Sequence, residues 1–158
     1  MKILVVSDTH GKNKKLIDRV KKMEKPDLLL HLGDYVGDGL IIAKALGITP
    51  IIVMGNGDHP SSGFKEEKVL EIKGKKIYLT HGHRLGVGFN LKRILYRARE
   101  LGVDIALYGH THVPLIERSD DIILMNPGSA SYPRGSSDKK TFGIIQINKE
   151  IDIKLIEI

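Results

Sequence analysis

Three apolar runs near the start of the chain alternate with helical patterns, and this alternation strongly limits the possible folds. Residues 2–7, 27–32 and 50–54 are rich in Ile, Leu and Val, as buried parallel strands are. Between them, residues 16–23 place apolar side chains on one helix face, and residues 40–46 read as a shorter helix that ends at Gly47. This order predicts right-handed crossovers and a parallel sheet.

The pattern changes after the third run. Residues 68–72 and 76–80 flank a hairpin turn, residues 91–101 read as a helix with Asn90 as its N-cap, and residues 104–108 read as a strand. Residues 113–158 alternate apolar and polar side chains, as antiparallel strands do. We therefore expect one domain, residues 1–158, with two packed mixed sheets and helices outside.

Composition excludes several classes of protein. The chain has no cysteine, which excludes disulfides, thiolate zinc sites and a cysteine nucleophile and favours the cytoplasm. We find no secretory signal before the first strand and no apolar stretch near the roughly 20 residues of a membrane span. The formal charge of +6 comes with lysine runs that read mainly as solvated surface, with attraction to an anionic substrate as the alternative.

Six short polar clusters stand in the chain, nearly all directly after an apolar run. The chain has seven histidines, and each lies in or next to this set of clusters. Because the carboxyl ends of parallel strands meet at one edge of a sheet, we expect the clusters to converge. The clusters are Asp8-Thr9-His10, Gly33-Asp34, Gly55-Asn56-Gly57-Asp58, His81-Gly82-His83, Gly109-His110-Thr111-His112 and Asn126-Pro127-Gly128.

Most of these clusters are weak signals when each is taken singly. Asp-x-His triplets are common by chance, the Gly-Asp pairs make good turns, and a lone histidine is usually structural. Together they offer too many ligands for one tetrahedral ion, which suits two ions that share a bridging carboxylate. Imidazole with carboxylate favours Mn, Fe, Zn, Co or Ni over Mg or Ca. The candidate ligands are Asp8, His10, Asp34, Asn56, His81, His110 and His112.

The order of these clusters resembles that of the calcineurin-like metallophosphoesterases, especially their small stand-alone branch of bacterial and archaeal phosphodiesterases. The resemblance covers nearly the whole chain, up to residues 126–129. It implies an α/β fold, a four-layer αββα sandwich of two mixed sheets flanked by helices. It also implies the ligand roles: one ion on Asp8, His10 and His112, the other on Asn56, His81 and His110, and a bridge through Asp34.

We therefore expect a metal-dependent phosphodiesterase. Two divalent transition-metal ions, with Mn preferred, would share a hydroxide that attacks phosphorus opposite the leaving oxygen. Asn56 could also contact the phosphate, and Asp58 could orient a neighbouring group. Arg84 is either a phosphate contact or an ordinary surface arginine. His31 is expected to be a buried structural histidine near the site.

One position departs from the best-studied members of the family. Many of them carry a histidine after the Asn of this motif, thought to protonate the leaving group, and here that position is Gly57. His59 and His83 are the candidates to replace it, although loop histidines are usually solvated. Without a good acid, we expect a preference for leaving groups of low pKa.

Other functions remain as alternatives. A phosphomonoesterase of the same mechanism is one, and a non-catalytic scaffold is another, since a eukaryotic relative of this fold is a scaffold subunit of the retromer coat. The complete ligand set favours the enzyme. A nuclease is disfavoured because aromatic and basic residues are not interleaved to stack bases. We expect a small phosphodiester substrate, no membrane or nucleic-acid partner, and a homodimer as an open option because relatives often dimerise.

Overall fold

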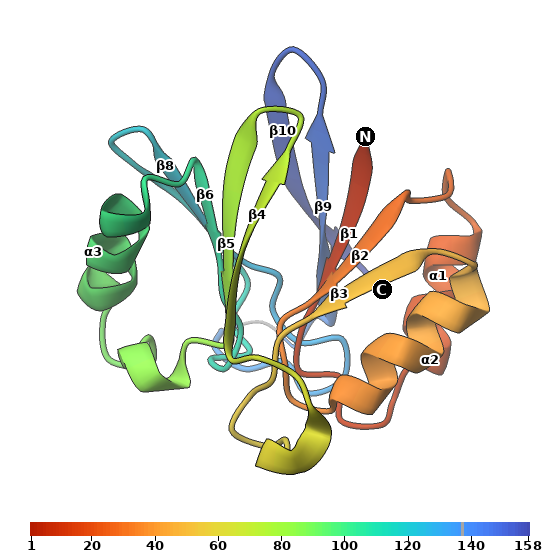
Figure 1. Cartoon of the computed structure of the whole chain (residues 1–158). Helices are drawn as coiled ribbons and strands as arrows, with labels where there is room; N and C mark the ends of the chain where they lie inside the picture. Colours follow the sequence, from red (N-terminus) through yellow and green to blue (C-terminus); the bar gives the residue numbers. More distant parts are fainter. Residues whose placement is uncertain (137) are drawn as a thin grey trace.

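The computed structural model describes residues 1–136 and 138–158 and contains two five-stranded sheets packed face to face (Figure 1). The first sheet has the order β10-β9-β1-β2-β3, and the second has the order β4-β5-β6-β8-β7. The first comprises β1 (Lys2–Val6), β2 (Leu28–His31), β3 (Thr49–Ile52), β9 (Thr141–Ile147) and β10 (Ile151–Glu157). The second comprises β4 (Glu67–Ile72), β5 (Lys75–Thr80), β6 (Ile105–Leu107), β7 (Leu115–Ser119) and β8 (Ile122–Asn126).

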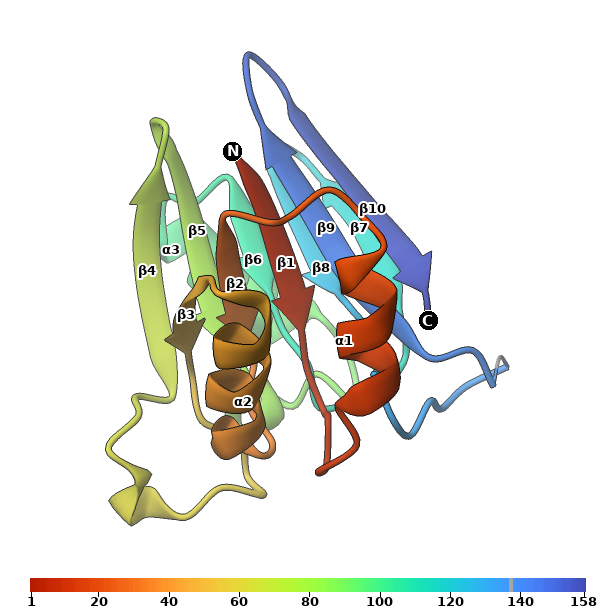
Figure 2. The ribbon, with the colours of Figure 1, turned by 90° about the vertical axis from the view of Figure 1, so that its right-hand side faces the viewer.

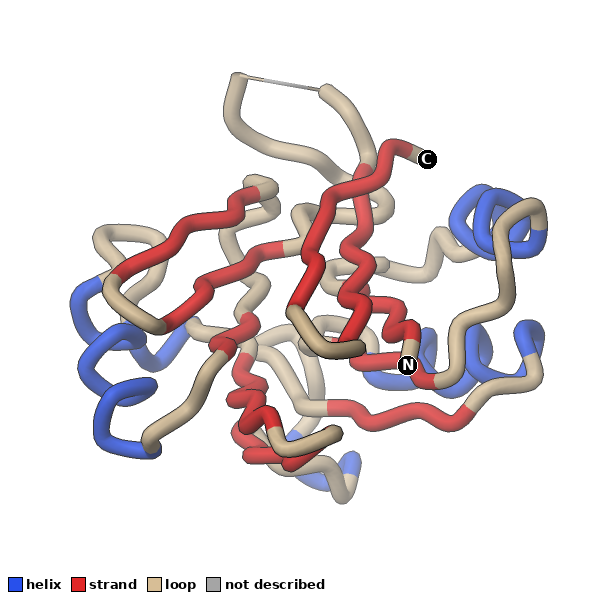
Figure 3. The backbone as a smooth tube through the Cα atoms, turned by 90° about the horizontal axis from the view of Figure 1, so that it is seen from above, coloured by secondary structure: helices blue, strands red, loops and turns tan. Residues whose placement is uncertain are grey.

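Helices cover the two outer faces. Helices α1 (Lys14–Lys21) and α2 (Val36–Leu46) lie over the first sheet (Figure 2), and α3 (Lys92–Leu101) lies over the second. From above, the strands form two layers between these helices (Figure 3). Two short 3-10 turns, η1 (Pro60–Ser62) and η2 (His83–Leu85), follow β3 and β5. The expected αββα sandwich of two mixed sheets is confirmed.

Three apolar cores fill the three interfaces between the layers. Strand β1 shows how the pleat divides its side chains: Ile3 and Val5 enter the core between the sheets, whereas Leu4 and Val6 pack with α1 and α2. A third core joins α3 to the second sheet. Burial of each such Ile, Leu or Val contributes roughly 1.5–3 kcal/mol. These cores hold the sheets in one relative position, which sets where the strand ends lie.

The parallel strands give each sheet a common carboxyl edge. In the first sheet β1, β2 and β3 are parallel neighbours, and in the second β5, β6 and β8 are. The tail forms two antiparallel hairpins, but they do not make a sheet of their own: β7–β8 completes the second sheet and β9–β10 completes the first. The polar clusters that follow the parallel strands therefore belong to two facing edges.

Two helix starts differ from the sequence prediction. Helix α2 begins at Val36 rather than near residue 40, after Tyr35 in the left-handed conformation with φ 75°. The Asp58 carboxylate accepts hydrogen bonds from the Tyr35 and Val36 amides at 2.8 Å, so a distant residue caps this helix. Helix α3 has Leu91 at its N-cap, although Asn90 Oδ1 does accept from the Lys92 amide at 3.1 Å.

The other helix boundaries follow local chemistry. Gly47 and Gly102 end α2 and α3 with φ 62° and 60°, the left-handed geometry that glycine adopts without strain. Across the described residues, no helix combines the length and the apolar character needed to cross a membrane.

Gly33 allows the end of β2 to pass against the segment after β3. A Cβ there would lie 2.5 Å from the Gly55 nitrogen and 2.8 Å from the Met54 carbonyl carbon, and φ is +94°. We predict that Gly33→Ala lowers the free energy of unfolding by about 3 kcal/mol through strain and overlap. Thermal denaturation should show a drop in Tm of roughly 6–12 °C.

Gly63→Ala is the matched control. Gly63 has φ +79°, but nothing lies within 4 Å of the position that a Cβ would take, so only the backbone strain of about 1 kcal/mol remains. Equal losses of Tm in the two variants would contradict the role of close approach at Gly33.

Candidate metal centre

The polar segments after β1, β2, β5 and β6 converge between the two sheets. The Asp8 amide donates to the Gly33 carbonyl at 3.2 Å, which joins the segments after β1 and β2. The Gly109 amide donates to the His81 carbonyl, also at 3.2 Å, which joins those after β5 and β6. The His110 amide donates to Asp8 Oδ2 at 3.1 Å and links the two sheets. The convergence is therefore built by the backbone as well as by side chains.

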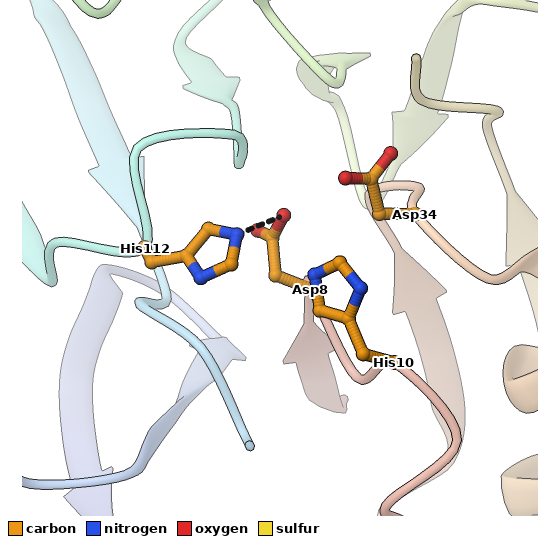
Figure 4. A group of neighbouring side chains, drawn as sticks. All are labelled: Asp8, His10, Asp34 and His112. Carbon is orange, nitrogen blue, oxygen red and sulfur yellow. Dashed lines mark ion pairs between the residues drawn. The ribbon is translucent and has the colours of Figure 1, made fainter. Parts of the chain in front are cut away.

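Four of the predicted ligands form one compact group. Ligand atoms of Asp8, His10, Asp34 and His112 all lie within 4.8 Å of one another, and the side chains point toward a common centre (Figure 4). His112 Nε2 is 3.1 Å from Asp8 Oδ1. Three of the four residues are buried, and His10 is half-buried. Carboxylate and imidazole groups held this way are a donor set for a divalent transition metal.

His81 faces the same group from the second sheet. Its Nε2 is 3.4 Å from Asp34 Oδ1 and 3.9 Å from Asp8 Oδ1. Its Nδ1 is 2.7 Å from the Leu32 carbonyl oxygen. A carbonyl only accepts hydrogen bonds, so Nδ1 carries a proton and the ring turns Nε2 toward the carboxylates, where it can serve as a ligand atom.

A hydrogen bond to a backbone carbonyl also orients His112. Its Nδ1 is 2.6 Å from the Tyr132 carbonyl oxygen, which leaves Nε2 directed at Asp8. Backbone carbonyls of this kind fix the tautomer and ring orientation of histidines that bind metals. Both rings are thus prepared to present Nε2 as a ligand atom.

His110 and Asn56 lie at the margin of the group. The His110 ring is half-buried, with its centroid 5.2 Å from that of His81. Asn56 is exposed, but its loop is tied to the cluster because the Gly57 amide donates to Asp34 Oδ1 at 2.8 Å. The structure thus brings five of the seven predicted ligands into direct proximity and leaves His110 and Asn56 beside them.

The buried nitrogen atoms of the cluster test whether a metal fits. Within the described part of the chain, His10 Nε2 and His81 Nε2 are buried and have no hydrogen-bond partner. A buried polar atom without a partner costs roughly 1–3 kcal/mol. A cation bound by these lone pairs would remove that cost, so the residues present fit a divalent metal.

The carboxylates are ionised. Burial opposes ionisation of Asp8, but the hydrogen bond from His112 and the charge of His81 outweigh it and lower the pKa of Asp8. Burial likewise opposes ionisation of Asp34, but His81, whose Nε2 lies 3.4 Å from Asp34 Oδ1, lowers the pKa of Asp34 well below the usual range. Two ionised carboxylates beside neutralisable imidazoles provide the negative charge that a cation site needs.

Backbone strain is concentrated at the predicted ligands. Positive φ occurs at Asp8 (55°), His10 (45°), Asp34 (53°), His110 (66°) and His112 (60°), five of the eight described non-glycine residues with this geometry. Each such residue costs on the order of 1 kcal/mol or more. The rest of the fold therefore holds the ligands in backbone conformations that they would not adopt alone.

Glycines give the cluster its compactness. A Cβ at Gly55 would overlap the Asp34 carboxylate, and a Cβ at Gly57 would lie 3.0 Å from Asp34 Oδ1. The space beside Gly57 is therefore tight. Asp58 Oδ2 accepts from the Gly55 amide at 2.8 Å and holds this loop in place.

The candidate proton donors His59 and His83 and the candidate phosphate contact Arg84 lie in three different settings. His59 is exposed, and its Nδ1 accepts from the Ser61 amide at 3.2 Å as the cap of η1. Arg84 has a side chain 73% exposed and pairs with Glu66 at 2.7 Å, as a surface arginine does. His83 lies closer, with its ring centroid 5.6 Å from His81 and 6.2 Å from His110. Of these three, His83 alone contacts the predicted ligands.

Sequence reasoning missed several residues around the cluster. Tyr35 and Tyr132 flank His10, with ring centroids 5.0 Å and 5.6 Å from its ring. Ser129 and Ser131 donate to the Asp8 carbonyl at 2.8 Å and 3.0 Å. Tyr35, Tyr132 and Ser131 carry no local signal in the sequence, whereas Ser129 entered only as the last residue of the family resemblance.

Asn126 supports the segment that carries His110. Its Nδ2 donates to the Gly109 carbonyl at 2.9 Å and to Thr111 Oγ1 at 3.0 Å. This residue belongs to the last of the six polar clusters in the sequence. The contact found is made by the Asn126 side chain, whose Oδ1 also accepts from the Gly128 amide at 2.9 Å.

His31 is fully buried beside the cluster, as expected for a structural histidine. Its Nδ1 accepts from the Gly33 amide at 3.3 Å, so the proton sits on Nε2, which lies 3.2 Å from Thr9 Oγ1. Burial lowers the pKa of His31 to about 4. This histidine is neutral and supports the two segments that carry Asp8 and Asp34.

Comparison with known proteins agrees with this geometry. The family model described as "Calcineurin-like phosphoesterase superfamily domain" matches residues 1–150. The chain is similar to the probable metallophosphoesterase YsnB of Bacillus subtilis, with 35% identity over 85% of this chain and 78% of YsnB. It is also similar to phosphodiesterase MJ0936 of Methanocaldococcus jannaschii, with 31% identity over 95% of each.

A solved structure of Vps29 from Entamoeba histolytica, complexed with zinc, shares the fold. Its TM-score is 0.82 at 23% identity, and the match covers 99% of both chains. At this identity the likeness concerns the fold alone.

The buried histidine gives a pH prediction for the metal-free protein. The unfolded state binds the His31 proton near the usual pKa of about 6.5, whereas the folded state binds it only near pH 4. Stability due to this group is therefore lost as pH falls through that interval. From about pH 7 to about pH 4.5, the free energy of unfolding should fall by roughly 2–3 kcal/mol more in the native protein than in His31→Gln.

Urea unfolding at several pH values, with a chelator present, measures this difference. Gln keeps a donor but does not titrate, so the other acidic and basic groups cancel between the two proteins. Parallel pH profiles would contradict a neutral buried His31.

Proposed function

This chain belongs to the calcineurin-like phosphoesterase superfamily, and we propose that it hydrolyses small phosphodiesters with divalent metal ions bound at the cluster described above. The observation that carries the proposal is the convergence of Asp8, His10, Asp34 and His112 within 4.8 Å. His81 approaches both carboxylates and adds a donor from the second sheet. A centre with two ions would need such additional donors.

We propose the ligand roles that the family resemblance implies, and this arrangement supports them. Asp8, His10 and His112 would hold one ion, and Asp34 would be shared. His81, with His110 and Asn56 beside it, would hold the other. The mixed imidazole and carboxylate donors suit Mn, Ni, Fe, Zn or Co, and we propose Mn as the preferred ion. Support comes from the unpartnered Nε2 atoms of His10 and His81.

Bound divalent ions would supply Lewis acidity, which withdraws charge from phosphoryl oxygens and makes water nucleophilic at neutral pH. The residues of the chain itself orient the ligand side chains. The Leu32 and Tyr132 carbonyls hold the Nδ1 protons of His81 and His112, and Asp58 holds the loop of Asn56 against the start of α2. We propose that the Asn56 amide, exposed at the mouth of the cluster, contacts the substrate phosphate.

Departure of the leaving group receives little help from the chain. Gly57 has no side chain, and His59 is engaged with Ser61. His83 is the remaining candidate to donate a proton, supported by its proximity to His81 and His110. Leaving groups of low pKa depart as anions and need no donor, so we propose that they are hydrolysed fastest.

Several parts of the proposal remain predictions. Residues 1–158 are proposed to form one metallophosphoesterase domain, supported by the family match over residues 1–150. The cytoplasmic location, homodimer formation and the preference for diesters over monoesters rest on the sequence. The scaffold alternative also rests on the sequence resemblance alone.

Replacement of the shared carboxylate tests the proposal. Asp34→Asn keeps the shape of the side chain but removes its charge, so metal content should fall and kcat/KM for bis(p-nitrophenyl) phosphate should drop by at least about 100-fold. Metal analysis after Mn loading and colorimetric assay measure the two effects, with p-nitrophenyl phosphate as the monoester for comparison.

Asp104→Asn is the control. Asp104 also accepts from a backbone amide, that of Lys76 at 2.8 Å, but it precedes β6 at the opposite end of the sheet. The Asp104→Asn variant should keep metal content and turnover within about twofold of the native protein. Native protein that binds Mn or Ni yet hydrolyses neither ester would support the scaffold instead.

A further inference from the structure

A pocket adjoins the metal centre on the side of η2 and the start of α3. Its volume is about 430 Å³, within the range of roughly 300–1,000 Å³ that is usual for small-molecule sites. His83 lines this pocket and also lies 5.6 Å and 6.2 Å, between ring centroids, from His81 and His110. The pocket and the metal centre therefore share a wall. The lining includes His83, Arg84, Leu85, Phe89, Asn90 and Arg93.

The pocket wall is held by tight turns. The Leu85 amide donates to the Gly82 carbonyl at 3.0 Å, and the Phe89 amide donates to the Gly86 carbonyl at 2.9 Å. Gly86 adopts φ +65° and ends η2. Asn90 Oδ1 accepts from the Lys92 amide and joins the segment to α3. These bonds hold the backbone that carries Phe89 and leads into α3 before any ligand arrives.

The two ends of the wall differ in chemistry. Phe89 is 94% exposed, which leaves its aromatic ring open on the pocket side. Arg93 takes part in none of the ion pairs among the described residues, whereas the charge of Arg84 is engaged by Glu66. The pocket thus offers one flat apolar surface and one free guanidinium.

We infer that this pocket binds one ester group of the substrate, and that this group is a planar aromatic ring with an anionic substituent. The ring would stack on Phe89 and the anion would pair with Arg93, while the phosphodiester reaches the metal centre past His83. This inference rests on the proposed function and assigns its substrate class.

Mixed diesters with one common leaving group test the pocket. The probes are 4-nitrophenyl esters of phosphate whose other ester group is methyl, phenyl or 4-carboxyphenyl, and release of 4-nitrophenolate gives kcat and KM for each. Native enzyme should favour carboxyphenyl over methyl. In Phe89→Ala, the ratio of phenyl to methyl kcat/KM should fall about tenfold, mainly through KM. In Arg93→Ala, the ratio of carboxyphenyl to phenyl should fall about fivefold.

Two residues of α3 provide matched controls. Tyr96→Ala removes an aromatic ring that is 68% exposed, and Lys92→Ala removes an exposed cation, but neither residue lines the pocket. Both controls should keep the native ratios. If Phe89→Ala and Arg93→Ala behave like these controls while diesters are still hydrolysed, the pocket assignment is wrong and the proposed function stands.

Binding without turnover gives an independent measurement. (4-Carboxyphenyl)phosphonate and methylphosphonate cannot be hydrolysed at the P–C bond, so calorimetric titration into Mn-loaded protein reports affinity alone. Native protein should bind the aryl compound about tenfold more tightly, and Phe89→Ala should lose this preference. If native protein prefers the aryl compound but hydrolyses no diester, the proposed function is wrong and the pocket assignment stands. If native protein binds both phosphonates equally, the pocket assignment is wrong.

Discussion

Face-to-face packing of the two sheets is the constraint on which the metal centre depends. Asp8, His10 and Asp34 come from the first sheet, whereas His81 and His112 come from the second, so no sheet alone holds the cluster. The apolar core between the sheets sets their distance and offset. The hydrogen bond from the His110 amide to Asp8 Oδ2 then fixes the contact at the shared edge. Apolar burial far from the chemistry thereby determines which polar atoms meet.

The cluster concentrates several unfavourable features in a small volume. Two ionised carboxylates are buried close together, two imidazole nitrogens lack partners, and five ligands have left-handed backbones. Each feature alone would destabilise the fold by about 1 kcal/mol or more. A bound divalent cation would offset the charge and the missing partners together, which links metal affinity to stability. Strain and unpaired polar atoms at one place are thus physical signs of a binding site.

Much of this arrangement could be predicted from the sequence, because it depends on periodicity and on strand ends. The parallel strands, the hairpin, the glycines that end α2 and α3, and the convergence of Asp8, His10, Asp34, His81 and His112 follow from such patterns. The start of α2 could not, since Asp58 caps it from a segment over twenty residues away. The same limit applies to Tyr35 and Tyr132 beside His10. These contacts depend on how loops meet in space, which no local pattern encodes.

We propose that the two facing sheet edges together hold a pair of cations. Crystals grown with Mn²⁺ and measured at the manganese absorption edge test it most directly, because anomalous scattering locates each ion without reference to a ligand assignment. We expect two peaks, one beside His10 and His112 and the other beside His81 and His110, with Asp34 touching both. A single peak, or peaks away from these side chains, would contradict it.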